Sequence, residues 1–193
     1  MVKILAFSGS LRENSYNRRV LNVAIEGARA AGAEVTLIDL RDFPMPAFNS
    51  DEYDQAFDEN AARFQDLLME HDGFLIASPE YNGTIPGGMK NIIDWASRPS
   101  PKYSKSVEVF KGKHAAIMTA SPGSFGGIRC LAHMRGMFTI MFVHVLPTEI
   151  AVTFANSKFE GDGTEMTDEK TKMILQDLGA SLAQMISRTK PST

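Results

Sequence analysis

Cysteine is almost absent from this chain, because Cys130 is the only one among 193 residues. A single thiol excludes an internal disulfide and any CxxC zinc or redox pair. The four histidines show no metal-binding spacing such as HExxH, so no metal site is expected. The longest apolar stretch, 137–146, contains Thr139 and His144 and is far shorter than the ~20 residues that cross a bilayer.

A strong charge of either sign is also missing. The 20 basic and 23 acidic residues leave a net charge of -3, which gives no global signal for nucleic acid or an anionic membrane. The first apolar run covers about six residues, which is shorter than the apolar region of a signal peptide. We therefore expect a cytoplasmic protein with neither nucleic acid nor membrane as a partner.

The pattern along the chain is an alternation of strands and helices. Length and an apolar fraction of 44% suit one compact domain over 1–193. Apolar and β-branched runs predict five strands, at 2–7, 34–40, 73–78, 113–120 and 144–153, the last broken near Pro147. Helical periodicity predicts five helices: one that Gly32 ends, one over 51–70 with a solvated acidic start, and three at 87–97, 128–142 and 168–187. Such alternation predicts a parallel sheet covered by helices on both faces.

Three chemically distinctive loops follow strand ends, at 8–17, 79–86 and 121–127. The carboxyl ends of parallel strands share one edge of a sheet, and ligands bind there at the switch in strand order. We therefore expect these three remote segments to form one site.

The first loop has the donors of a phosphate site. Ser8, Ser10, Ser15 and Asn17 supply uncharged donors, Arg12 supplies a cation, and a helix opens directly afterwards. Several donors with one charge suit a phosphomonoester, and the loop is neither a Walker A motif nor a GxGxxG fingerprint. The alternative is a capped turn, in which Ser15 or Asn17 caps the helix.

The second loop suits a flat heterocycle. Asn82 and Gly83 allow a close backbone approach, Tyr81 is an aromatic neighbour, and Pro79 and Pro86 stiffen the loop. The alternative is an ordinary tight turn before a helix.

The third loop could be a second wall for the same ring. Gly123, Gly126 and Gly127 permit close approach, and Ser121 and Ser124 add donors. The alternative is a flexible turn between a strand and a helix. Neither Ser10 nor Ser124 lies in a GxSxG elbow, and no acid–base pair is evident, so a bound cofactor is expected to carry the chemistry.

Three segments resemble one family. GSLRENSYN at 9–17, SPEYNGTIPGGMKNIIDW at 78–95 and SPGSFGG at 121–127 are similar to the NAD(P)H-dependent FMN reductases, close to the bacterial members that reduce chromate and quinones. The resemblance extends from Ile4 to about Phe154. It implies a flavodoxin-like three-layer sandwich with a five-stranded parallel sheet in the order 2-1-3-4-5.

The resemblance also implies roles for the three loops. The first would hold the FMN phosphate, the second would contact the isoalloxazine ring, and the third would line the other side of that ring. The implied cofactor-binding residues are Ser8, Ser10, Arg12, Ser15, Asn17, Pro79, Glu80, Tyr81, Asn82, Gly83, Ser121, Gly123, Gly126 and Gly127.

The implied activity is a ping-pong transfer of electrons from NADPH or NADH, through FMN, to a quinone or a similar small acceptor. The alternatives are a flavodoxin-type electron carrier without substrate turnover and a nucleotide-binding or hydrolytic α/β protein without flavin. The resemblance further implies a homodimer or homotetramer with the flavin near a subunit interface. Arg129 and Glu149 are candidates for that interface, and solvated surface charge is the alternative for both.

Overall fold

Six parallel strands form one sheet in the computed structural model, which describes residues 1–53, 57–161, 163 and 165–190. The strands run in the order β2-β1-β3-β4-β5, and β6 also pairs with β4. This confirms the predicted flavodoxin-like order. Their bounds are β1 Lys3–Ser8, β2 Glu34–Leu37, β3 Gly73–Ala77, β4 His114–Ala120, β5 His144–Val145 and β6 Ile150–Val152.

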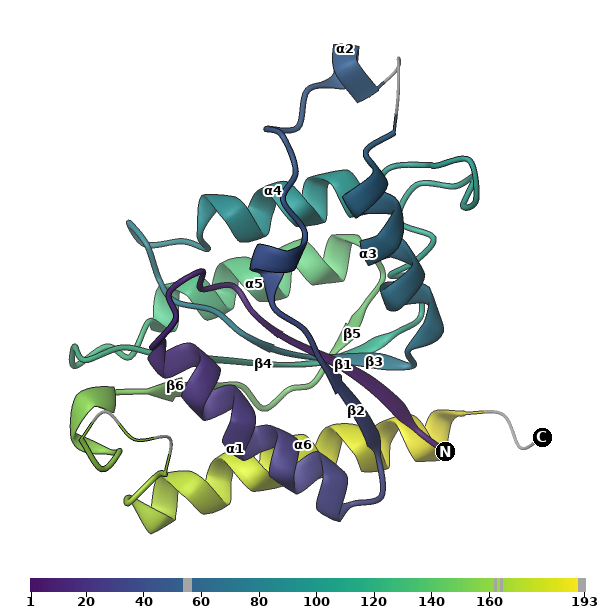
Figure 1. Cartoon of the computed structure of the whole chain (residues 1–193). Coiled ribbons are helices and arrows are strands. Elements are labelled where there is room, and N and C mark those ends of the chain that lie inside the picture. Colours follow the sequence, from purple (N-terminus) through teal and green to yellow (C-terminus); the bar gives the residue numbers. More distant parts are fainter. Residues whose placement is uncertain (54–56, 162, 164, 191–193) are drawn as a thin grey trace.

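Helices cover both faces of the sheet, as Figure 1 shows. Their bounds are α1 Tyr16–Ala30, α2 Ser50–Tyr53, α3 Glu59–Glu70, α4 Gly87–Ala96, α5 Ile128–Ile140 and α6 Glu169–Thr189. α1 and α6 lie on one face, and α3, α4 and α5 lie on the other. The predicted three-layer arrangement is therefore confirmed.

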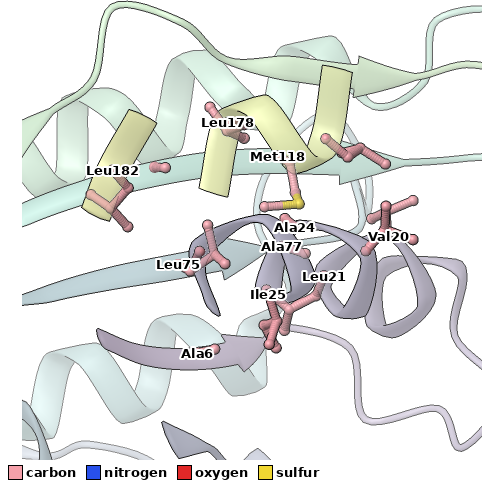
Figure 2. Close-up of a cluster of buried hydrophobic side chains, with 14 of the residues drawn as sticks. Ala6, Val20, Leu21, Ala24, Ile25, Leu75, Ala77, Met118, Leu178 and Leu182 are labelled. Carbon is pink, nitrogen blue, oxygen red and sulfur yellow. The ribbon is translucent and has the colours of Figure 1, made fainter. Parts of the chain in front are cut away.

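The strand residues alternate between two buried clusters. Toward α1 and α6 the strands present several small side chains, among them Ala6 and Ala77. Leu21 and Ile25 from α1 and Leu178 from α6 fill that face (Figure 2). Larger side chains of the same strands, such as Phe7, Phe74 and Ile76, pack on the other face.

Two predicted boundaries are confirmed by local geometry. α1 ends as expected at Gly32, whose φ of 86° is favourable for glycine. The N–H groups of Gly32 and Ala33 bond to the carbonyls of Arg29 and Ala28, which is a Schellman motif. The predicted fifth strand is interrupted, because β5 pairs with the start of β4 and β6 with its end.

Two other predicted boundaries are wrong. One helix over 51–70 was expected, but Asp58 has an extended backbone and its carboxylate caps α3 by accepting the N–H groups of Asn60 and Ala61. Residues 54–56 of that prediction lie outside the described part of the chain. The second strand stops at Leu37 rather than at residue 40, because Asp39 caps a short 3₁₀ turn that begins there. No helix among the described residues is long and apolar enough to cross a membrane.

Candidate functional site

The three predicted loops meet at the carboxyl ends of β1, β3 and β4 (Figure 1). Backbone hydrogen bonds bring them together: Gly9 donates to Ala77, Ser78 donates to Met118, and both bonds continue the pairing of the sheet. Between the loops lies a cavity of about 120 Å³, which we call the three-loop hollow. It is lined by Ser10, Arg12, Ser15, Tyr16, Asn17, Pro79, Glu80, Tyr81, Ala120, Ser121 and Pro122.

The first loop is shaped by its own serine hydroxyls. Ser8 Oγ accepts the N–H of Ser10, and Ser10 Oγ accepts the N–H of Arg12. Ser15 is the N-cap of α1 and accepts the N–H of Asn17 at 3.2 Å, so the capped-turn interpretation is confirmed for Ser15. A capped helix N-terminus remains favourable for an anion, because its first N–H groups keep their positive field.

Free donors remain at this end of the hollow. Within the described residues, the backbone N–H groups of Tyr16 and Arg18 have no protein acceptor. The side chain of Arg12 is exposed, and no described residue accepts a hydrogen bond from its guanidinium. The loop therefore has one cation and two backbone donors available to an incoming ligand.

Asn17 is used inside the protein. Its side-chain amide donates to the carbonyl of Ala120 and accepts the N–H of the same residue, both at 2.9 Å. Asn17 lines the hollow but is 3% exposed. Its amide joins the start of α1 to the end of β4.

The second loop forms the turn that its sequence predicts. Tyr81 and Thr84 exchange backbone hydrogen bonds across Asn82 and Gly83, which have φ values of 52° and 81°. Two successive positive φ values are those of a type I′ turn, for which Asn-Gly is the favoured pair. The turn leaves the ring of Tyr81 46% exposed beside the hollow.

Glu80 points its carboxylate at the first turn of α5. Its oxygens accept the N–H of Arg129 at 3.0 Å, the N–H of Cys130 at 3.4 Å and a guanidinium hydrogen of Arg129 at 2.9 Å. Desolvation raises the pKa of Glu80, but these hydrogen bonds outweigh it and the pKa is lowered. Glu80 is therefore an anionic cap for α5, whose own N-cap, Gly127, has no side chain.

The third loop packs closely on the sheet. A Cβ added to Gly127 would lie 2.2 Å from Thr119 Oγ1, and one added to Gly126 would lie 3.0 Å from the backbone at Val152 and Thr153. Both glycines are needed for contact with the protein itself and have positive φ. Ser121 lines the hollow and accepts the N–H of Gly123.

Eight of the predicted site residues line the hollow: Ser10, Arg12, Ser15, Asn17, Pro79, Glu80, Tyr81 and Ser121. The other six do not line it: Ser8, Asn82, Gly83, Gly123, Gly126 and Gly127. Tyr16, Ala120 and Pro122 line it without having been predicted. Ala120 and Pro122 lie on either side of Ser121 at a strand end, and this position is a sequence signal that they line the same site.

Cys130 and Trp95 lie outside the hollow. Cys130 is fully buried, and burial raises its pKa to about 11, so its thiol is protonated at neutral pH. Trp95 is 2% exposed and donates its indole N–H to the carbonyl of Pro46. Both are core residues.

The chain is similar to flavin-dependent reductases over most of its length. The sequence model of the family NADPH-dependent FMN reductase matches residues 2–157. An NAD(P)H-dependent FMN reductase of Pseudomonas aeruginosa is 37% identical over 180 residues, which cover 93% of this chain and 92% of that protein. An NAD(P)H:quinone oxidoreductase of Solanum tuberosum is 36% identical over 196 residues, which cover 98% and 95%.

Similarity to solved structures agrees with these sequence matches. The flavoenzyme FerB of Paracoccus denitrificans, an NAD(P)H:(acceptor) oxidoreductase, superimposes with a TM-score of 0.81 at 28% identity. The match covers 97% of this chain and 98% of that one.

Proposed function

Because the chain belongs to the NADPH-dependent FMN reductase family, we propose that the three-loop hollow binds FMN and that the protein passes electrons from NAD(P)H to a quinone or a similar small acceptor. The observation that carries this proposal is the set of free donors beside Tyr81 at the carboxyl ends of the strands. The chain is an NAD(P)H-dependent oxidoreductase, and the proposal concerns where the cofactor binds and what accepts the electrons.

The donors at one end of the hollow fit the phosphate of FMN. Arg12 would provide a full positive charge, and the hydroxyls of Ser10 and Ser15 would provide uncharged hydrogen bonds. The free N–H groups of Tyr16 and Arg18 add the field of the α1 N-terminus. A phosphomonoester suits this combination, since the cation offsets part of its negative charge and the neutral donors bond to its oxygens.

The other end of the hollow fits a flat ring. Pockets that enclose a drug-sized ligand usually have volumes of roughly 300–1,000 Å³, and the hollow measures about 120 Å³. We therefore propose that the isoalloxazine ring lies at the open mouth, between the turn at Tyr81 and the segment around Ser121. The exposed ring of Tyr81 would be its aromatic neighbour.

The residues of the hollow are suited to binding and orienting a ligand, and they supply no acid–base pair. Glu80 is engaged with α5, and Arg12 is a permanent cation. FMN held by the first loop and by the turn at Tyr81 would supply the redox chemistry, which is hydride acceptance from the nicotinamide and electron donation to the acceptor. The chain binds the flavin, orients it and leaves one side open to a second flat molecule.

The open side of the proposed flavin site bears on which acceptor binds and in what order the two substrates react. The relatives named as quinone oxidoreductases support a quinone as the acceptor. If nicotinamide and quinone use the same space in turn, the kinetics are ping-pong. The electron donor is NADPH or NADH, as the NAD(P)H-dependent relatives support.

We further propose that the chain forms one flavodoxin-like domain over 1–193 and assembles as a homodimer or homotetramer in the cytoplasm. Each of the three loops has one large apolar side chain that is about half or more exposed, which supports assembly: Leu11, Tyr81 and Phe125. Arg129 pairs with Glu80 and Glu149 with Arg135 inside the chain, and their presence at a subunit contact remains a prediction. Dependence on the cellular pool of NAD(P)H supports the location.

Two measurements test the proposed function. Protein loaded with FMN and freed of excess flavin should show flavin absorbance, and titration of the apoprotein should give a Kd far below high-micromolar concentration. A failure to bind FMN would contradict the proposed function. The loaded protein should oxidise NAD(P)H rapidly with a quinone and give parallel lines in double-reciprocal plots. Intersecting lines would contradict the shared space, whereas binding without turnover would favour an electron carrier.

A further inference from the structure

The turn at Tyr81 is connected to α5 by several side chains. Glu80 accepts from the N–H groups of Arg129 and Cys130, and Cys130 Sγ donates to the carbonyl of Pro79 at 3.4 Å. A third connection joins Thr84 Oγ1 to Nδ1 of His133 at 2.7 Å. The second loop is therefore held along the first two turns of α5.

The third loop is reached through the same helix. The guanidinium of Arg129 lies 4.9 Å from the ring centroid of Phe125, which belongs to the third loop. The same guanidinium bonds to Glu80 at 2.9 Å. Glu80 is thus connected through Arg129, which lies 49 residues further along the chain, to the loop that carries Ser121.

We propose that Glu80 is a positioning residue for the flavin ring: its carboxylate holds the second and third loops at the spacing that the ring requires. This inference rests on the proposed function, because it assumes that the two loops are the walls of a flavin site. A site whose walls are already fixed binds more tightly, since binding does not have to order them. Glu80 would act through Tyr81 and Ser121, without contacting the ring.

Glu80 makes an ion pair with the Arg129 side chain and hydrogen bonds to backbone N–H groups of α5, and the two should contribute differently to stability. The side chain of Arg129 is 56% exposed and that of Glu80 is 14% exposed. An ion pair with one exposed partner contributes little, because water screens it. The N–H of Cys130 also donates to the carbonyl of Gly127 at 3.0 Å. For the N–H of Arg129, Glu80 is the acceptor that the described residues provide at the first turn of α5, so this part of the cap should outweigh the ion pair.

The test compares flavin affinities of three apoprotein variants by fluorescence quenching. Glu80→Gln should weaken FMN and riboflavin equally, by about tenfold, because the ring and not the phosphate loses its walls. Arg129→Gln keeps the backbone donors and should weaken both flavins by less. Asp58→Asn is the matched control, since Asp58 also caps a helix with two N–H bonds, on α3 and away from the hollow, and it should leave both affinities unchanged.

The pH dependence of riboflavin binding gives a second readout, which is measured first in the wild-type protein. Riboflavin has no phosphate to titrate. Wild-type affinity should be constant at neutral pH and fall as the pH drops through the lowered pKa of Glu80, because protonation removes the anionic cap. Glu80→Gln should lack this part of the profile.

Three outcomes would overturn the inference. The first is that Glu80→Gln binds flavins as tightly as the wild type. The second is that Asp58→Asn loses as much flavin affinity as Glu80→Gln. The third is that the riboflavin affinity of the wild type does not fall at acid pH. Each leaves the proposed function intact as long as wild-type protein binds FMN. Failure of the wild type to bind either flavin would instead remove the proposed function and the inference together.

Discussion

The side-chain amide of Asn17 bonds to the backbone of Ala120 on both sides, donating to its carbonyl and accepting its N–H at 2.9 Å. This pair joins the beginning of α1 to the end of β4. The two segments are 103 residues apart in the sequence and border the same hollow.

Replacing Asn17 with Ala should therefore lower stability. The change leaves a buried N–H and a buried carbonyl of Ala120 without partners, and each orphaned group costs about 1–3 kcal/mol. The free energy of unfolding of the apoprotein, measured in urea, should fall by about 2–6 kcal/mol. Asn14→Ala, on the exposed part of the same loop, is the control and should change little. Equal stability of the two variants would show that water replaces the amide.

Arg12→Ala should separate FMN from riboflavin. A charge-assisted hydrogen bond is worth roughly 1.5–3 kcal/mol, so FMN should bind about ten- to a hundredfold more weakly. Riboflavin lacks the phosphate, and its affinity should barely change. Titration of both ligands into wild-type and variant apoprotein measures the difference. Equal losses for the two ligands, or no loss for either, would show that Arg12 does not contact the phosphate.

The sequence was sufficient to predict the edge of the sheet where the site lies. Short apolar runs end at Ser8, Ser78 and near Ser121, and the parallel topology brings those ends together whatever the intervening segments are. The Asn82-Gly83 turn was also predictable, since its conformation depends on two adjacent residues. Local signals were therefore reliable for strand ends and turns.

Contacts across the chain were not predictable in this way. Their position in a motif predicts that Glu80 and Asn17 contact the ligand, whereas the structure shows both bonded to distant backbone groups. The sequence predicts that Gly126 and Gly127 leave space for a ring, but Thr119 and the backbone near Val152 fill the space beside them. Only the fold shows which of these partners is near.

One missed boundary did have a local signal. Asp58 followed by Glu59 is a usual beginning for a helix, with a capping carboxylate and an acidic first turn. The acidic character of the preceding residues obscured it. Asp39 gave a similar signal for the 3₁₀ turn that ends β2.

Two glycine substitutions should change stability in opposite directions. α1 and α6 cross so closely that a Cβ on Gly179 would lie 1.9 Å from the carbonyl oxygen of Ala24, and the backbone there cannot move aside. Gly179→Ala should lower the free energy of unfolding by about 3 kcal/mol, by forcing the helices apart. Gly136 on α5 has open space around it. Gly136→Ala should raise stability by roughly 0.5–1 kcal/mol, because alanine has the higher helix propensity.

Urea denaturation of both variants checks this pair. Since both replace a helical glycine with alanine, the change in helix propensity is the same, and the difference between them measures the crowding at the crossing of α1 and α6. A stabilised Gly179→Ala variant would mean that the two helices separate without loss of packing.

The last prediction concerns His114, at the opposite end of the sheet. Its ring centroid lies 5.2 Å from that of His144 on β5, and Nε2 lies 3.5 Å from Thr189 Oγ1 on α6. Burial lowers the pKa of His114, and the neighbouring His144 lowers it further. The folded protein therefore takes up this proton less readily than the unfolded chain, in which histidine has its ordinary pKa of 6.5.

The free energy of unfolding should be unaffected by His114 above pH 6.5 and should decrease as the pH falls from about 6.5 through the lower pKa of the folded state. His114→Gln should remove this part of the decrease, while carboxylate titration at more acid pH remains in both proteins. Urea unfolding of the wild type and the variant between about pH 7.5 and 5 measures the difference. Parallel pH profiles for the two proteins would show that His114 titrates normally in the folded state.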